Sequence, residues 1–139
     1  MTARTEAQRR PRPVAGFSCF VTGTDTGVGK TLVAAALVRA LAARGERVSG
    51  MKPVAAGAQW SDGAWRNEDV EALAAAGNSA APREDVCPYL LRDPMAPHIA
   101  AERAGVRLQI PVLLQAYAEL RERVRLTAAS ASPPARRRS

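Results

Sequence analysis

The sequence predicts an α/β protein with a parallel sheet and flanking helices, and three consecutive segments carry that prediction. Residues 16–22 (GFSCFVT) form a short β-branched and aromatic run typical of a strand, which Gly23 ends. Residues 30–44 place Leu, Val and Ala at helical spacing, and Gly45 follows as a C-terminal cap. Residues 47–54 (RVSGMKPV) indicate a second strand. Strand, loop, helix and strand in this order open a parallel α/β sheet.

The rest of the predicted folded part consists of helices and loops. Residues 55–65 are expected to form a glycine-containing loop. Asn67 is a suitable N-cap for a helix over residues 68–76, whose first turn carries three acidic residues that suit the positive end of the helix dipole. Prolines make residues 78–97 loop-rich. Two further helices are expected, a short one over residues 98–104 and an amphipathic one over residues 111–124.

The two ends of the chain differ in composition from the part between them. Residues 1–15 are polar and basic, and we expect a disordered lead-in rather than a secretory signal. Residues 125–139 (RLTAASASPPARRRS) hold one leucine, no aromatic residue and a terminal arginine triplet, too little apolar surface to order the segment. The sequence therefore predicts one folded part, residues 16–124, between a disordered lead-in and a disordered basic tail.

The net charge of +7 belongs to those ends. Four arginines and one glutamate give residues 1–16 a charge of +3, and six arginines and one glutamate give residues 121–139 a charge of +5, which leaves −1 between them. A nucleic-acid-binding domain would carry its positive charge on the fold, so we expect no nucleic-acid partner. No run approaches the ~18 apolar residues of a membrane span, and we expect a cytoplasmic protein without membrane contact.

Cysteine and histidine are too few for several kinds of site. Two cysteines do not make a disulfide framework or a thiolate metal cluster, and the single histidine excludes a site built from several imidazoles. Cys19 stands within the apolar run of the first predicted strand, where an ordinary buried small residue is expected.

A glycine-rich segment, GTDTGVGKT (23–31), lies between the first predicted strand and the first helix and matches a phosphate-binding loop. Gly27 and Gly29 let the backbone approach a phosphate, and the helix that starts near Lys30 adds its positive end. Lys30 can place charge on the β- and γ-phosphates, and the Thr31 hydroxyl can ligate Mg²⁺. The first glycine stands one position early, so the loop is a variant of the strict pattern. An ordinary glycine-rich turn is the structural alternative.

Four segments together resemble dethiobiotin synthetases in order and spacing. They are FVTGTDTGVGKT, GMKPVAAG, RNEDVEAL and CPYLLRDPMAPHIAAERAG, and the resemblance covers roughly residues 17–120. It implies a P-loop NTPase-like fold and a ligase of biotin biosynthesis. Such an enzyme uses ATP and Mg²⁺ to close the ureido ring of dethiobiotin on 7,8-diaminononanoate with CO₂. It also implies a homodimer with the active site near the subunit interface.

The resemblance assigns roles to single residues. Lys52 corresponds to the catalytic lysine, which stabilises charge on the substrate carbamate and the transferred phosphoryl group; a solvated strand-end lysine is the alternative. Asp69, together with Thr31, corresponds to a Mg²⁺ ligand, although a carboxylate also simply suits a helix N-terminus, and Glu68 is easily confused with it. The predicted nucleotide-binding residues are Gly27, Val28, Gly29, Lys30, Thr31, Leu32 and Asp69.

The resemblance stops near Val124. In the family, a further core strand, another Mg²⁺-ligating residue and the nucleotide-base pocket follow, whereas this chain continues with Ala, Arg, Pro and Ser. We interpret the change as a shifted reading frame or an early stop, so that the C-terminal half is missing and the chain is inactive or incomplete. A non-catalytic nucleotide-binding fragment therefore stays open. So does a partition-type P-loop ATPase, although that group typically has a second lysine where this chain has Thr24 and Asp25.

Overall fold

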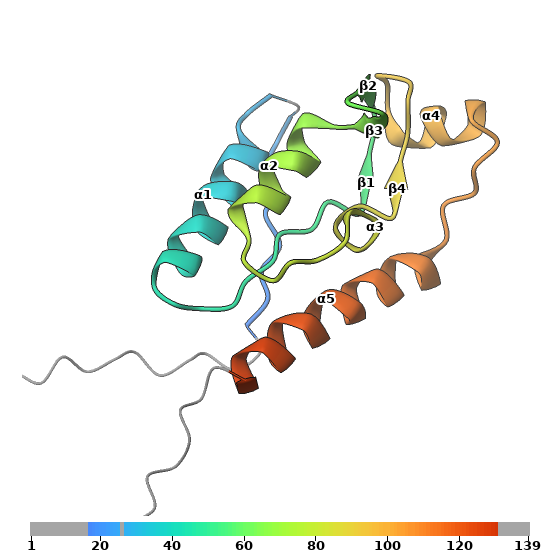
Figure 1. Ribbon diagram of the computed structural model, residues 1–139. Helices are drawn as coiled ribbons and strands as arrows, with labels where there is room; N and C mark the ends of the chain where they lie inside the picture. The colour runs from blue at the N-terminus through green and yellow to red at the C-terminus, as the bar shows by residue number, and fades with distance from the viewer. Residues whose placement is uncertain (1–16, 26, 131–139) are drawn as a thin grey trace, which may run out of the picture.

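The computed structural model describes residues 17–25 and 27–130 (Figure 1). Within them, both helices and short strands are present along the chain, as in an α/β fold. The elements are α1 (Lys30–Ala43), β1 (Val54–Ala55), β2 (Gln59–Ser61), β3 (Ala64–Arg66), α2 (Glu68–Ala76), α3 (Arg83–Val86), β4 (Tyr89–Leu90), α4 (Pro97–Arg103) and α5 (Ile110–Ser130).

Strands β1 and β4 pair in parallel, which confirms the predicted fold class. Backbone hydrogen bonds extend the pairing beyond the strands: the Lys52 N–H donates to the Val86 carbonyl at 2.8 Å, and the Ala58 N–H donates to the Leu91 carbonyl at 3.0 Å. The expected strand over residues 47–54 would place Lys52 near its end, whereas in the structure Lys52 precedes β1 by two residues. The residues in register are Val54 with Tyr89 and Ala55 with Leu90.

The first expected strand is not formed over its described part, residues 17–22. A strand needs a neighbour that pairs with its backbone groups, and among the described residues no backbone hydrogen bond joins this segment to another. Phe17 is 66% exposed and Phe20 is 88% exposed. Cys19 is exposed as well, so the expectation that it is buried is wrong for the same reason.

The second strand was expected over residues 47–54, but β1 begins only at Val54, the last residue of that range. The preceding backbone is held by α2 instead. Asn78, just beyond α2, accepts a hydrogen bond from the Val48 N–H at 2.9 Å. Gly50 approaches α2 so closely that a Cβ at this position would lie 3.0 Å from the Leu73 side chain. Helix contacts thus take the place of a neighbouring strand here.

The helices were predicted more accurately than the strands. Helix α2 has the expected bounds, α1 ends one residue earlier than expected, and α4 begins and ends one residue earlier than expected. Gly45 follows α1 with a φ of 85°, the left-handed conformation of a C-terminal cap.

Helix α5 runs through Ser130, past the expected end at residue 124. Residues 125–130 contain Arg, Leu and Ala, which are good helix formers, and Arg125 pairs with Glu122 one turn earlier at 3.5 Å. The disorder expected from residue 125 is therefore wrong for residues 125–130. The lead-in, residues 1–15, and the rest of the expected tail, residues 131–139, lie outside the described residues.

Two stretches that were expected to be loops contain regular structure. Strands β2 and β3 form an antiparallel hairpin, with Asp62 and Gly63 at the turn at φ values of 51° and 78°. An Asp-Gly pair between short strands is a known hairpin signal that the loop interpretation missed. Trp60 and Trp65 face each other across the hairpin, with their ring centroids 5.6 Å apart. Helix α3 and strand β4 lie in the loop-rich stretch that follows.

The buried apolar residues form two clusters against the parallel strands. The larger cluster joins β1, α2, α3 and α5, and the smaller joins the end of β4 to α4. No helix in the described part of the chain is both long and apolar enough to cross a membrane. The larger cluster consists of Ala55, Val70, Val86, Cys87 and Leu120, and the smaller of Leu91, Ala100 and Ala101.

Candidate functional site

The glycine loop leads directly into α1 and leaves the start of that helix open. Gly27 and Gly29 have φ values of 79° and 95°, conformations that favour glycine and that help successive backbone N–H groups to surround an anion. Gly29 is the N-cap, no described side chain caps the helix, and its first turn carries no acidic residue. The first N–H groups and the positive end of α1 are therefore available to a phosphate.

Lys30, the first residue of α1, folds back along its own loop. Its Nζ donates a hydrogen bond to the Asp25 carbonyl. Its stem passes over Gly23, where a Cβ would lie 3.0 Å from the Lys30 Cγ and 2.8 Å from the Val28 Cγ2. The missing side chain at Gly23 therefore lets the lysine reach across the loop.

The other predicted loop residues lie beside Lys30. Thr31 and Leu32 belong to the first turn of α1, and Thr31 is half-buried. Leu32 is 75% exposed and Val28 is 53% exposed, so neither contributes its side chain to the core of the described fold. The described contacts include none between Thr31 and Asp69, the two predicted Mg²⁺ ligands.

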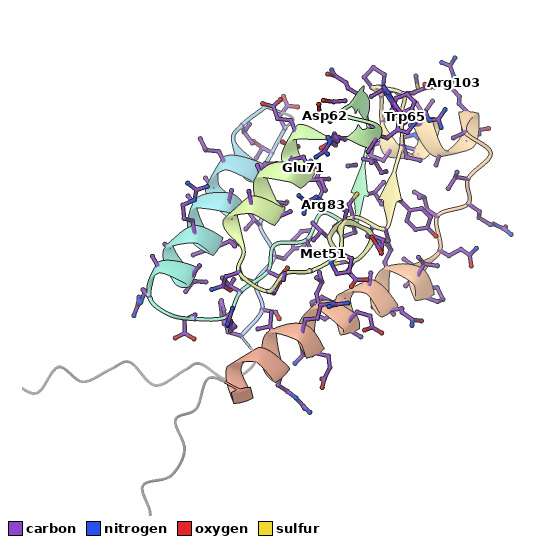
Figure 2. The ribbon with its side chains drawn as sticks, in the orientation of Figure 1. Met51, Asp62, Trp65, Glu71, Arg83 and Arg103 are labelled. Carbon is purple, nitrogen blue, oxygen red and sulfur yellow. The ribbon has the colours of Figure 1, made fainter. Side chains whose placement is uncertain are left out.

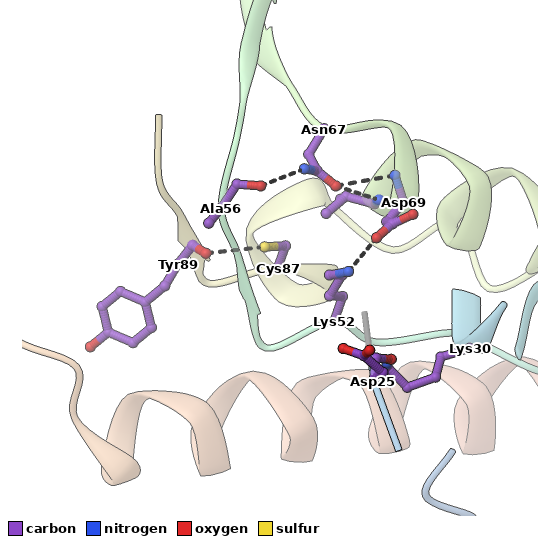
Figure 3. Close-up of polar contacts among 9 residues, drawn as sticks. Asp25, Lys30, Lys52, Ala56, Asn67, Asp69, Cys87 and Tyr89 are labelled. Carbon is purple, nitrogen blue, oxygen red and sulfur yellow. Dashed lines mark hydrogen bonds and ion pairs between the residues drawn. The ribbon is translucent and has the colours of Figure 1, made fainter. Parts of the chain in front are cut away.

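Lys52 and Asp69 meet, although they are 17 positions apart in the sequence (Figure 3). The Lys52 Nζ forms an ion pair with the Asp69 Oδ2, and the two side chains are 30% and 43% exposed. A pair this exposed contributes roughly 0–1 kcal/mol to stability. Its importance is therefore in its location, because it joins the segment just before β1 to the first turn of α2.

The position of Asp69 depends on the cap of α2. The Asn67 Oδ1 accepts hydrogen bonds from the N–H groups of Asp69 at 3.1 Å and Val70 at 3.3 Å, which confirms the predicted cap. The Asn67 Nδ2 donates to the Ala56 carbonyl at 3.2 Å. This second contact crosses to the segment after β1, and the sequence analysis did not anticipate it.

Glu71, in the same turn, is held by two arginines. Figure 2 labels Glu71 and one of the two, Arg83. Arg83 donates from Nε to Oε1 at 3.0 Å and from Nη2 to Oε2 at 2.9 Å, and the Arg66 Nη1 lies 3.4 Å from Oε2. The hydrogen bonds from Arg83 lower the pKa of the Glu71 carboxyl. These contacts tie β3, α2 and α3 together and leave Asp69 as the carboxylate that faces Lys52.

A surface cavity of about 350 Å³ adjoins Asp69, between the hairpin and the start of α2. Its size lies near the lower end of the range for small-molecule sites. No described residue of the glycine loop lines it. The lining includes Gly57, Gln59, Ser61, Asn67, Glu68 and Asp69.

The available oxygen donors suit Mg²⁺. The Thr31 hydroxyl and the Asp69 carboxylate are hard ligands, and Mg²⁺ is usually bound through one or two protein groups together with nucleotide phosphates and water. Within the described residues, no three or more His, Cys, Asp or Glu side chains gather into a metal cage. The donor set therefore fits an ion that arrives with a nucleotide.

An open helix start behind a glycine loop, on a parallel α/β scaffold, defines the class of a P-loop nucleotide-binding protein. A family model described as an AAA domain matches residues 18–127. The chain belongs to that family.

Two curated relatives give a more particular likeness. The chain is 55% identical over 108 residues to the ATP-dependent dethiobiotin synthetase BioD of Nitrosospira multiformis. It is 51% identical over 105 residues to the protein of the same name from Ralstonia nicotianae. These matches cover 78% and 76% of this chain and 46% of each relative. The resemblance to dethiobiotin synthetases is thus confirmed, and the chain spans about half the length of the curated relatives it matches.

Proposed function

We propose that this chain carries the phosphate-binding and lysine-bearing half, residues 16–124, of a dethiobiotin synthase that uses ATP and Mg²⁺. The observation that carries the proposal is the contact between Lys52 and Asp69. The family resemblance gives these two residues separate roles, and the fold brings them together at the start of a helix. Both relatives are named ATP-dependent dethiobiotin synthetase, which supports an ATP-dependent reaction that forms dethiobiotin.

In this proposal, the glycine loop and Lys30 bind the triphosphate. The open N–H groups of α1 donate hydrogen bonds to the phosphate oxygens, and Lys30 exchanges its contact with the Asp25 carbonyl for the β- and γ-phosphates. When bound, Mg²⁺ would neutralise phosphate charge from the oxygens of Thr31 and Asp69.

Lys52 acts on the other substrate. Addition of CO₂ to an amine of 7,8-diaminononanoate gives a carbamate, whose negative charge the Lys52 ammonium stabilises while ATP supplies the phosphoryl group. Transfer of the γ-phosphoryl group to the carbamate oxygen releases ADP. The second amine then attacks the carbonyl carbon, loses its proton to solvent, closes the ureido ring and releases inorganic phosphate. The cavity beside Asp69 offers a place for part of this substrate. A cytoplasmic homodimer is the form that the family resemblance supports.

The test is incorporation of ¹⁴C-bicarbonate into diaminononanoate in the presence of ATP and Mg²⁺. Lys52→Ala is expected to lower incorporation by about a hundredfold or more, the usual cost of removing one group that stabilises transition-state charge. Asp69→Asn should raise the Mg²⁺ requirement, whereas Glu68→Gln, its neighbour in the same turn, should not. Incorporation that survives Lys52→Ala would contradict the assigned role.

A second candidate function is nucleotide binding without turnover. It is favoured by the open start of α1, whose N–H groups can bind a phosphate without any contribution from Lys52 or Asp69. Equilibrium dialysis with labelled ATP separates the two candidates, because a binding fragment takes up ATP in a Mg²⁺-dependent way and incorporates no bicarbonate. Lys30→Ala should weaken ATP uptake under either candidate, since both need the phosphate contact.

A further inference from the structure

Asn67 uses both ends of its side-chain amide, one on each side of the candidate site. Its Oδ1 accepts hydrogen bonds from two N–H groups at the start of α2, including that of Asp69. Its Nδ2 donates a hydrogen bond to the Ala56 carbonyl. Ala56 lies four residues after Lys52. The contacts therefore close a ring: from Lys52 along β1 to Ala56, across Asn67 to Asp69, and back through the ion pair (Figure 3).

A helix cap alone does not require asparagine. Serine and aspartate cap helices about as well, because the cap needs only an oxygen that accepts from the first N–H groups. An ionised aspartate has no hydrogen to donate, and a serine hydroxyl is shorter than the asparagine amide. Asparagine combines an acceptor with a separate N–H donor on a short side chain. The residue at position 67 therefore meets a second requirement, the contact with Ala56.

We propose that Asn67 is a positioning residue that holds the Asp69 carboxylate against Lys52. It fixes the first turn of α2 to the segment after β1, so the distance between the carboxylate and the ammonium is set by the fold and not by two mobile side chains. The expected effect on Mg²⁺ and nucleotide rests on the proposed function. The effect on the ion pair does not.

Asn78 provides a matched control at the other end of α2. It also bridges the helix to backbone near β1, accepting from the Val48 N–H at 2.9 Å and donating to the Glu46 carbonyl at 2.8 Å. Neither contact involves Lys52 or Asp69. Replacing each asparagine by serine therefore removes a similar bridge, but only at position 67 is that bridge next to the candidate site.

The chain's two lysines, Lys30 and Lys52, make a direct test possible. Limited acetylation of the full chain without nucleotide, quantified for each lysine by mass spectrometry, reports how free each amine is. Asn67→Ser is expected to raise the Lys52 rate about twofold to fivefold, with Lys30 as internal reference, because complete loss of so exposed an ion pair would give about fivefold at most. Asn78→Ser should leave both rates unchanged. Urea unfolding of both variants shows that they fold.

A second measurement connects the ion pair to the site. The Mg²⁺ concentration for half-maximal ATP binding should rise in Asn67→Ser by a similar factor and stay constant in Asn78→Ser. A Lys52 acetylation rate that is the same in Asn67→Ser as in the wild type, or that rises equally in Asn78→Ser, would overturn the positioning role. A wild-type chain without Mg²⁺-dependent ATP binding would overturn the proposed function, and the acetylation rates would still decide the role of Asn67.

Discussion

The two helices that carry the candidate site residues begin in opposite ways. Helix α1 starts at Gly29 with no described side-chain cap and no acidic residue in its first turn, and the one described residue that it buries is Val38. Helix α2 starts with the Asn67 cap and three acidic residues, and it buries three residues of its own. Both helices have a positive N-terminal end, but only the first leaves that end open.

This difference separates a binding element from a positioning element. An uncapped helix start has N–H groups that a phosphate can satisfy, so ligand binding gains the most there. A capped start has already satisfied its N–H groups and can instead hold a side chain, here Asp69, in a fixed place. Packing follows the same division: Phe20 before α1 is 88% exposed, whereas Val86, which packs in the core cluster with α2, is 1% exposed.

The largest expected effect on stability comes from replacing leucine by alanine in α2, and the same replacement in α1 is the comparison. Leu73 in α2 is 5% exposed and Leu32 in α1 is 75% exposed. Leu73→Ala should lower the free energy of unfolding by about 2–5 kcal/mol, because it leaves a cavity against Gly50. Leu32→Ala should change it by less than about 0.5 kcal/mol. Urea unfolding measures both, and equal costs would mean that the face of α1 is covered in solution.

A smaller difference is expected between the reaction rates of the two cysteines, one near each helix. Cys19 is exposed beside the loop, whereas Cys87 is 6% exposed in the larger cluster, and burial raises the pKa of its thiol. Cys87 should react with an aromatic disulfide reagent at least about tenfold more slowly than Cys19, since both local opening and ionisation disfavour it. The Cys19→Ser variant should show only the slow phase. A single fast phase in that variant would show that the α2 core opens as readily as the loop side.

The parts of the fold that could be predicted from the sequence are those set by local signals, and the strands that depend on a partner could not be predicted. Helix α2 was predicted with its bounds and cap because Asn67, the acidic first turn and the apolar spacing are all local signals. The strand over residues 16–22 failed because a strand also depends on a partner, which the described residues do not provide. Strand β4 was missed for the converse reason: residues 89–90 have no strand pattern of their own and pair because β1 lies beside them.

The candidate site shows the same limit. Lys30, Lys52 and Asp69 could be chosen from motifs, since each belongs to a recognisable segment. Their contacts could not be predicted, because the pairing of Lys52 with Asp69 depends on how α2 packs against the chain before β1. The link from Asn67 to Ala56 has no separate sequence signal, since asparagine is also one of the common residues at a helix N-cap.

The smallest expected effect on stability concerns Glu71, which lies in the first turn of α2 and pairs with two arginines. Its pKa is lowered from the usual 4.5 mainly by the hydrogen bonds from Arg83. The unfolded chain lacks these contacts, so the carboxylate stabilises the fold above the usual pKa, and this contribution is lost as the pH falls through the lowered one.

Glu71→Gln should therefore reduce the free energy of unfolding by about 0.2–1 kcal/mol near neutral pH, the range for partly exposed pairs. The difference from wild type should shrink as the pH falls below 4.5 and through the lowered pKa of the Glu71 carboxyl. Urea unfolding across this range measures it, with the exposed Glu84→Gln as control. A difference that stayed constant at low pH would mean that Arg83 does not recognise the ionised carboxylate. Packing, and not the ion pairs, would then hold β3, α2 and α3 together. The hydrogen bonds of Asn67 would be the main polar contacts that fix the start of α2.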